Sequence, residues 1–297
     1  MALWIPISLA AAAVQTLRFL LQRRLKVLGL STGAATFSRF VFAAPLAWGL
    51  VLVLVAAGQD WPGPGARFWA WAVTGGLGQI VGTWCTVSMF TMRNFAVGIA
   101  FTKTETVQVA LFSAVMLGEA VSWPGFAAIL VGVAGVVLLS WPKGARLQGA
   151  VLNPTLAVGL VAGAAFAMAA IGYRAAALSL GDGHYVFRAS FTLACVTTVQ
   201  TVMMLVMLHF REPDAIVGVA RAWKTTALVG LTGMLGSLGW FTAFTLQNAA
   251  YVRALGQVEL LFGLAVSAVF LGERVTRREA LGMALLGVSI LAIVLAA

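Results

Sequence analysis

The sequence is poor in charge, and poorest in acidic residues. Only 9% of its 297 residues are charged, and the whole chain contains nine Asp and Glu residues. A soluble domain usually carries about 25% charged residues, so this composition excludes a soluble enzyme.

Histidine and cysteine are equally scarce, with two of each. Cys85 and Cys195 lie inside apolar runs, so we expect neither a disulfide framework nor a metal site. The chain has no H-E-x-x-H, no Gly-x-Ser-x-Gly and no P-loop. We therefore expect no catalytic residues, no cofactor and no direct use of ATP, and an intramembrane enzyme is a poor fit.

What the sequence does have is long apolar runs, with 61% hydrophobic residues and a mean hydropathy of +0.99. A helix of about 20 apolar residues crosses a bilayer. We predict an all-α integral membrane protein with ten transmembrane helices in the lipid bilayer. The predicted spans are 3–22, 31–57, 68–92, 95–117, 123–141, 153–177, 185–209, 223–247, 250–271 and 276–296.

The net charge of +10 comes largely from the connections between the spans. Such basic loops indicate the cytoplasmic side of a membrane. They account for the positive net charge, so we expect no nucleic-acid partner. Only Arg67 and Arg174 lie clearly in even-numbered connections. We therefore expect a multi-pass protein of the cell (inner) membrane, with both termini outside the cytoplasm. The bases of the odd-numbered connections are Arg23, Arg24, Lys26, Arg93, Lys143, Arg146, Arg211, Arg221, Lys224, Arg274, Arg277 and Arg278.

An internal repeat divides the chain. Residues 76–119 align with 230–273 without gaps, with 15 identities in 44 positions that include three pairs of polar residues. Five spans in each half would invert the second half relative to the first, which is a common transporter design. We predict two inverted five-helix repeats, 1–150 and 151–297, around a central cavity. The pairs of charged or amide residues are Asn94/Asn248, Glu105/Glu259 and Glu119/Glu273.

These features resemble the drug/metabolite transporter superfamily, and most closely its ten-helix EamA-like members. The resemblance rests on an Arg in the second helix of each half, Arg39 and Arg188. It also rests on a Leu-Gly-Glu that closes each fourth helix, at 117–119 and 271–273. It implies a basket of ten helices that exports or exchanges a small metabolite by alternating access. The family usually has a proline where this chain has Thr106 and Leu260.

Ionisable residues inside spans are costly, so each is a candidate for substrate binding or gating. Snorkelling to the interface is the alternative for Arg18, Arg39 and Arg253, which lie near span ends. The seven candidates are Arg18, Arg39, Lys103, Glu105, Arg188, Arg253 and Glu259.

Lys103 and Glu105 are placed near the middle of the fourth span. On a continuous helix they would point to opposite faces, because two residues span about 200°. Glu105 and its repeat mate Glu259 would approach a common position, and Gln257 matches Lys103. The alternative is a buried pair that only fixes the packing of the helices.

Four further polar or aromatic residues are candidates. Asn94 and Asn248 would either bond between helices or contact the substrate. Trp84 and Trp240 lie within spans and could stack on a substrate, whereas most tryptophans should anchor at the interface.

The candidates together favour a secondary transporter of an anionic or amphipathic solute, acting as an exporter or exchanger. Bases outnumber acids in the spans, which favours an anion. A flippase for a lipid-linked substrate on the same scaffold is the alternative. We expect a small-molecule substrate, a monomer, and protons as a candidate coupling ion.

Overall fold

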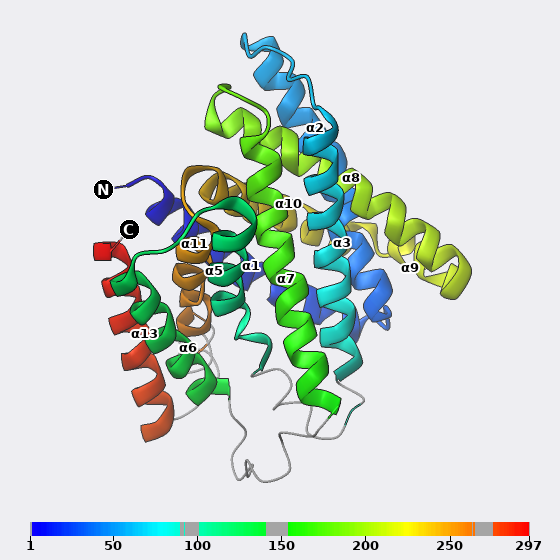
Figure 1. Ribbon diagram of the computed structural model, residues 1–297. Coiled ribbons are helices and arrows are strands. Elements are labelled where there is room, and N and C mark those ends of the chain that lie inside the picture. Colours follow the sequence, from blue (N-terminus) through cyan, green and yellow to red (C-terminus); the bar gives the residue numbers. More distant parts are fainter. Residues whose placement is uncertain are drawn as a thin grey trace. The chain divides into compact units, whose positions relative to one another are not determined.

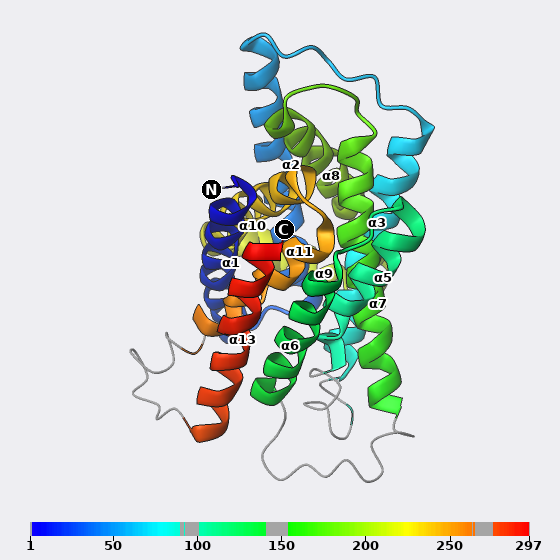
Figure 2. The same cartoon turned by 60° about the vertical axis from the view of Figure 1, so that its left-hand side comes forward.

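The computed structural model describes residues 2–89, 92, 101–140, 154–262, 264 and 276–296. Figures 1 and 2 show its helices. By its internal contacts the chain divides into two compact units, each described separately. Unit 1 comprises Met1–Gly76 and Gly172–Leu246, and unit 2 comprises Leu77–Ile171 and Gln247–Ala297. Each unit draws helices from both predicted repeats, so the contact units do not follow the boundary at 150. The two repeats themselves stay a prediction.

Unit 1 is organised around α10 (Trp223–Leu246), which packs against α1 (Trp4–Val27), α2 (Thr32–Ala56) and α8 (Tyr185–Arg211). The short α9 (Pro213–Arg221) contacts α2 and α8. Parts of α3 (Ala66–Ser88) and α7 (Pro154–Leu178) complete the unit. Ser31 begins α2 as its N-cap, because its hydroxyl accepts a hydrogen bond of 3.0 Å from the Ala34 amide.

Unit 2 contains two closely packed pairs of helices. In one, α6 (Trp123–Ser140) lies along α13 (Arg277–Ala296), as Figure 2 shows. A Cβ added to Gly135 would come within 2.9 Å of the Gly282 carbonyl, so only small residues fit at this crossing. In the other pair, α5 (Glu105–Leu117) contacts α11 (Ala249–Gly256).

Among the residues that the structure describes, seven helices are long and apolar enough to cross a membrane. They correspond to seven of the predicted spans, with ends that agree within a few residues. They are Trp4–Gln22, Thr32–Ala56, Trp123–Ser140, Pro154–Leu178, Tyr185–Arg211, Trp223–Leu246 and Arg277–Ala296.

The other three predicted spans have a different outcome. The third is the helix α3, which is not among the seven. The fourth and ninth contain shorter helices, α5 and α11. The described residues therefore do not establish ten spans. We predicted a connection at 210–222, but α9 forms there, with Pro213 in its first turn and Arg221 in its last.

Two pairs of helices that the predicted repeat relates to one another also pack together, α2/α8 and α6/α13, each within one unit. The contact between α5 and α11 joins non-equivalent parts of the fourth and ninth spans, because the repeat aligns α5 with residues 259–271. Part of the aligned region, including Leu271-Gly272-Glu273 and Asn94, lies outside the described residues.

Candidate functional site

The fourth predicted span is interrupted at Lys103 and Thr104. Residues 101–102 are helical, the next two form a turn, and α5 begins at Glu105. The Thr104 hydroxyl donates to the Phe101 carbonyl at 2.7 Å and accepts from the Gln108 amide at 3.0 Å. Such side-chain bonds offer the backbone an alternative to the helical ladder. The prediction that Lys103 and Glu105 lie on one continuous helix was therefore wrong.

The ninth predicted span has a matching interruption. The helix α11 ends at Gly256, Gln257 forms a turn, and residues 258–262 are helical again. The Gln257 side chain turns back to the Arg253 carbonyl at 3.4 Å. Gln257 is the repeat mate of Lys103, so the two interruptions fall at equivalent positions of the sequence repeat.

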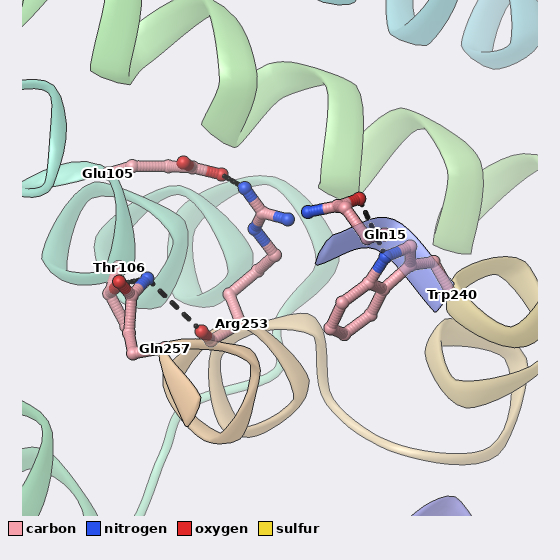
Figure 3. A network of polar contacts seen from close by, with 6 residues as sticks. All are labelled: Gln15, Glu105, Thr106, Trp240, Arg253 and Gln257. Carbon is pink, nitrogen blue, oxygen red and sulfur yellow. Dashed lines mark hydrogen bonds and ion pairs between the residues drawn. The ribbon is translucent and has the colours of Figure 1, made fainter. Parts of the chain in front are cut away.

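An ion pair joins the two interrupted helices within unit 2. The Arg253 guanidinium of α11 contacts the Glu105 carboxylate in the first turn of α5 (Figure 3). The Glu105 side chain is 7% exposed and the Arg253 side chain 24%. An acid in a first helical turn also interacts favourably with the helix dipole. Arg253 keeps a further donor, because its buried Nε has no hydrogen-bond partner in the described part of the chain.

A second contact lies beside the ion pair. The Gln257 amide donates to the Thr106 hydroxyl at 3.2 Å, and both side chains are buried (Figure 3). Thr106 stands where the resemblance places a proline. A hydroxyl there connects the two interrupted helices directly.

The helix α7 packs closely against the interruption of the fourth span. A Cβ added to Gly163 would meet the Thr102 carbonyl at 3.1 Å and the Gln108 amide nitrogen at 3.0 Å. Gly163 therefore lets α7 approach the polar backbone at the start of α5.

Other predicted site residues of unit 2 have different surroundings. Lys103 and Glu259 are half-buried, and each lies at or just after an interruption. Asn248 is the N-cap of α11 and donates to the Glu119 carbonyl at 2.9 Å, which is a bond between helix ends. Trp84 is 44% exposed. Asn94 lies outside the described residues.

Unit 1 contains a separate polar seam between α1, α2 and α10. On α1, Gln15, Arg18 and Gln22 follow a helical spacing and share a face. The Arg18 guanidinium donates to the Gln22 amide oxygen at 3.3 Å. The Trp240 indole of α10 donates to the Gln15 amide oxygen at 3.0 Å (Figure 3).

Arg39 of α2 enters the same seam. Its guanidinium donates to the Ser237 hydroxyl of α10 at 3.2 Å and lies 5.3 Å from the centre of the Phe40 ring. Gly233 makes room for both arginines of the seam. A Cβ at this glycine would come within 3.0 Å of the Arg39 Cγ and 3.6 Å of the Arg18 Cδ.

Arg188 does not join this seam. It donates to the Gly181 carbonyl at 2.8 Å, at the start of α8, and its Nε is buried without a hydrogen-bond partner in the described part of the chain.

Sequence reasoning identified the charged members of both clusters and two of their neutral partners, Gln257 and Trp240, but missed Gln15, Gln22 and Ser237. Gln15 and Gln22 carried a usable signal, because they stand three and four residues from Arg18 on one helix face. The sequence contains no signal for Ser237, since hydroxyl residues are frequent in apolar helices and their side chains bond within their own turn.

Comparison with known proteins finds a similar fold for the whole chain and a family model that matches part of it. A solved crystal structure is similar over 99% of both chains, with a TM-score of 0.71 at 14% identity, which shows the fold alone. No curated protein matches the sequence.

Residues 154–295 match the EamA-like transporter family, which supports the resemblance to the drug/metabolite transporter superfamily. Together with the seven apolar helices, this match supports a multi-pass membrane protein. The family suggests a transporter of small solutes and is consistent with a protein that is not an enzyme.

Proposed function

We propose that the chain is a secondary transporter that moves a small solute by alternating access. The observation that carries the proposal is the pair of interrupted helices in unit 2, which meet at the Glu105–Arg253 ion pair. In transporters, discontinuous helices present main-chain groups and helix ends to a solute near the middle of the bilayer. The packing of α2 against α8 and of α6 against α13, which the predicted repeat relates to one another, supports two inverted repeats.

The solute is anionic or amphipathic, and the protein works as an exporter or exchanger. The buried Nε of Arg253 and the half-buried Lys103 supply donors that suit a negatively charged group. Glu105 and Glu259 are the acids through which protons would couple to transport. We further propose that the protein functions as a monomer.

One observation favours the alternative, a flippase for a lipid-linked substrate. An apolar groove of about 510 Å³ runs along α2 and α10 on the surface of unit 1. Phe42, Pro45, Leu228 and Leu231 line it, together with Trp223 and Lys224. An acyl chain and an anionic headgroup would suit such a groove.

The chain lies in the inner membrane with both termini outside the cytoplasm. This orientation follows from the basic loops. A cysteine replacing Ala2 should react with an impermeant maleimide in intact cells. A cysteine replacing the exposed Ala220 of α9 should react only after the cells are opened.

Transport in proteoliposomes tests the function. Purified protein is first screened by thermal shift against amino acids, organic phosphates, nucleotides and lipid headgroups, because a ligand that binds the native state stabilises it. The stabilising compounds are then tried in counterflow, with soluble and lipid-linked forms compared. Lys103→Gln should reduce uptake of an anion severalfold, while Arg67→Gln, at an exposed position of α3, should not. Unchanged uptake in Lys103→Gln would remove Lys103 from the site.

A further inference from the structure

The apolar groove of unit 1 lies beside a direct contact between α2 and α10. A side chain at Gly230 would collide with Phe42, so the two helices touch there, and Phe42 also lines the groove. The groove has a volume of about 510 Å³. Along α10 its lining begins at Trp223 and ends at Leu231. Among the described residues that line it, only Lys224 is charged.

The groove starts at the end of a helix and stops within one leaflet. Trp223 is the first residue of α10, and Leu231 lies eight residues further on. At about 1.5 Å per residue this distance is about 12 Å, whereas one leaflet contributes about 15 Å to the hydrocarbon core of a bilayer. A tryptophan and a lysine in the first turn of a span are typical of the membrane interface. The groove therefore leads from the interface toward the middle of the bilayer, as an acyl chain does.

The interface end of the groove is rich in positive charge. The side chains of Leu25, Ala35 and Val229 pack together, so the end of α1 and the starts of α2 and α10 lie at one end of unit 1. Arg221 and Lys224 form no ion pair within the described part of the chain. The exposed bases at this end are Arg24, Arg211, Arg221 and Lys224, and its exposed acids are Glu212 and Asp214. Of the two acids, Glu212 already accepts a hydrogen bond from the Ser31 hydroxyl.

An anionic phospholipid matches both features of this surface. An acyl chain suits an apolar groove as deep as one leaflet, and a phosphate suits bases that have no counter-charge. Anionic lipids gather in the cytoplasmic leaflet, where the proposed orientation places this end of unit 1. A transmembrane helix of a second copy would need a complementary face through both leaflets, and a groove of about 12 Å is too short for that.

We propose that the groove between α2 and α10 binds one anionic phospholipid. An acyl chain lies along Leu228 and Leu231, and the phosphate lies at Lys224 and Arg221. The site belongs wholly to unit 1, and it does not depend on the identity of the transported solute. In a transporter of small solutes this lipid is a resident ligand and not cargo.

Native mass spectrometry of the full chain, released from a neutral detergent, counts the bound lipids. With equal amounts of phosphatidylglycerol and phosphatidylcholine that carry the same acyl chains, the wild type should retain one phosphatidylglycerol. Lys224→Gln should lower the ratio of retained phosphatidylglycerol to phosphatidylcholine about fivefold, the effect of one base near an anionic headgroup. Lys224→Arg should keep the ratio. Leu228→Trp, which fills the groove, should lose both lipids.

Two matched variants control for charge and bulk. Arg67→Gln removes an exposed base from α3, and Leu52→Trp adds the same bulk to an exposed position of α2 outside the groove. Both should retain lipid as the wild type does. Thermal unfolding in detergent checks that each variant folds, and Leu231→Trp replaces Leu228→Trp if the latter does not.

No retained lipid or equal retention of the two lipids by the wild type, or an unchanged ratio in Lys224→Gln, would overturn the site. A dimer that Leu228→Trp disrupts would assign the groove to a second copy and would also overturn it. If the protein moves labelled phosphatidylglycerol between the leaflets of proteoliposomes and Leu228→Trp abolishes the movement, the lipid is cargo, which overturns a resident ligand and favours the flippase. If the protein retains phosphatidylglycerol at Lys224 but exchanges no solute, the lipid site stands and the proposed transport fails.

Discussion

The two units handle charge inside an apolar environment in opposite ways. Unit 1 contains eleven basic and four acidic residues, and unit 2 contains eight basic and five acidic residues. In unit 2 a buried acid, Glu105, is paired with Arg253. In unit 1 every acid is exposed, while Arg18 donates to Gln22 and Arg39 donates to Ser237 within the seam.

The helices of the two units also differ in their continuity. Unit 1 is built from long helices, and its α2 and α10 run 25 and 24 residues without a break. Unit 2 interrupts the chain at Lys103–Thr104 and again at Gln257. Unit 2 thus places a compensated charge beside two breaks in its helices, whereas the arginines of unit 1 lie between continuous helices.

The largest expected effect is the loss of the ion pair in unit 2. Glu105→Gln should lower the free energy of unfolding by about 3 kcal/mol, because it leaves Arg253 without its counter-charge. The partial exposure of Arg253 places the effect at the low end of the usual range for buried pairs. Thermal unfolding in detergent, followed by tryptophan fluorescence, measures it.

The double variant Glu105→Gln/Arg253→Gln is the critical control. It should recover most of the loss, because neither charge then remains alone. Asp60→Asn, at an exposed position, should change little. If the double variant is as unstable as Glu105→Gln alone, packing rather than charge compensation holds the two interrupted helices together.

A smaller effect should be shared by both units. The neutral bond from Gln257 to Thr106 in unit 2 has a counterpart in unit 1, the bond from Trp240 to Gln15. Double-mutant cycles with Thr106→Val and Gln257→Leu, and with Gln15→Leu and Trp240→Phe, should each give a coupling of about 0.5–1.5 kcal/mol. Similar coupling energies in the two cycles would mean that the units differ in their charges and not in their neutral hydrogen bonds. A large difference between the two energies would contradict that view.

Much of this fold follows from apolar patterning alone. Seven predicted spans agree with helices of the structure, because a backbone in lipid has to satisfy its own polar groups. The interruptions could not be predicted in this way, since residues 95–117 and 250–271 are each long and apolar enough for one span despite their few polar residues. They depend on bonds such as that from the Thr104 hydroxyl to the Phe101 carbonyl, and on the approach of Gly163.

The candidate site residues were also only partly predictable from the sequence. Charge in a span identified Arg18, Arg39, Glu105 and Arg253, because an ionisable residue is rare there. Which of them meet was not predictable, since Gly233 brings two arginines together through contacts between helices distant in the sequence.

The smallest expected change has the opposite sign, and it tests the comparison most directly. Arg39→Gln should leave the free energy of unfolding unchanged or raise it by on the order of 1 kcal/mol. The variant removes a half-buried charge that has neutral partners, whereas Glu105→Gln creates such a charge. Arg24→Gln, an exposed change on α1, sets the baseline. A loss of 3 kcal/mol in Arg39→Gln would mean that this arginine is as well compensated as Arg253. Unit 1 would then compensate this charge as fully as unit 2 does, whereas a neutral or stabilising result indicates a charge that is retained at a cost to the fold.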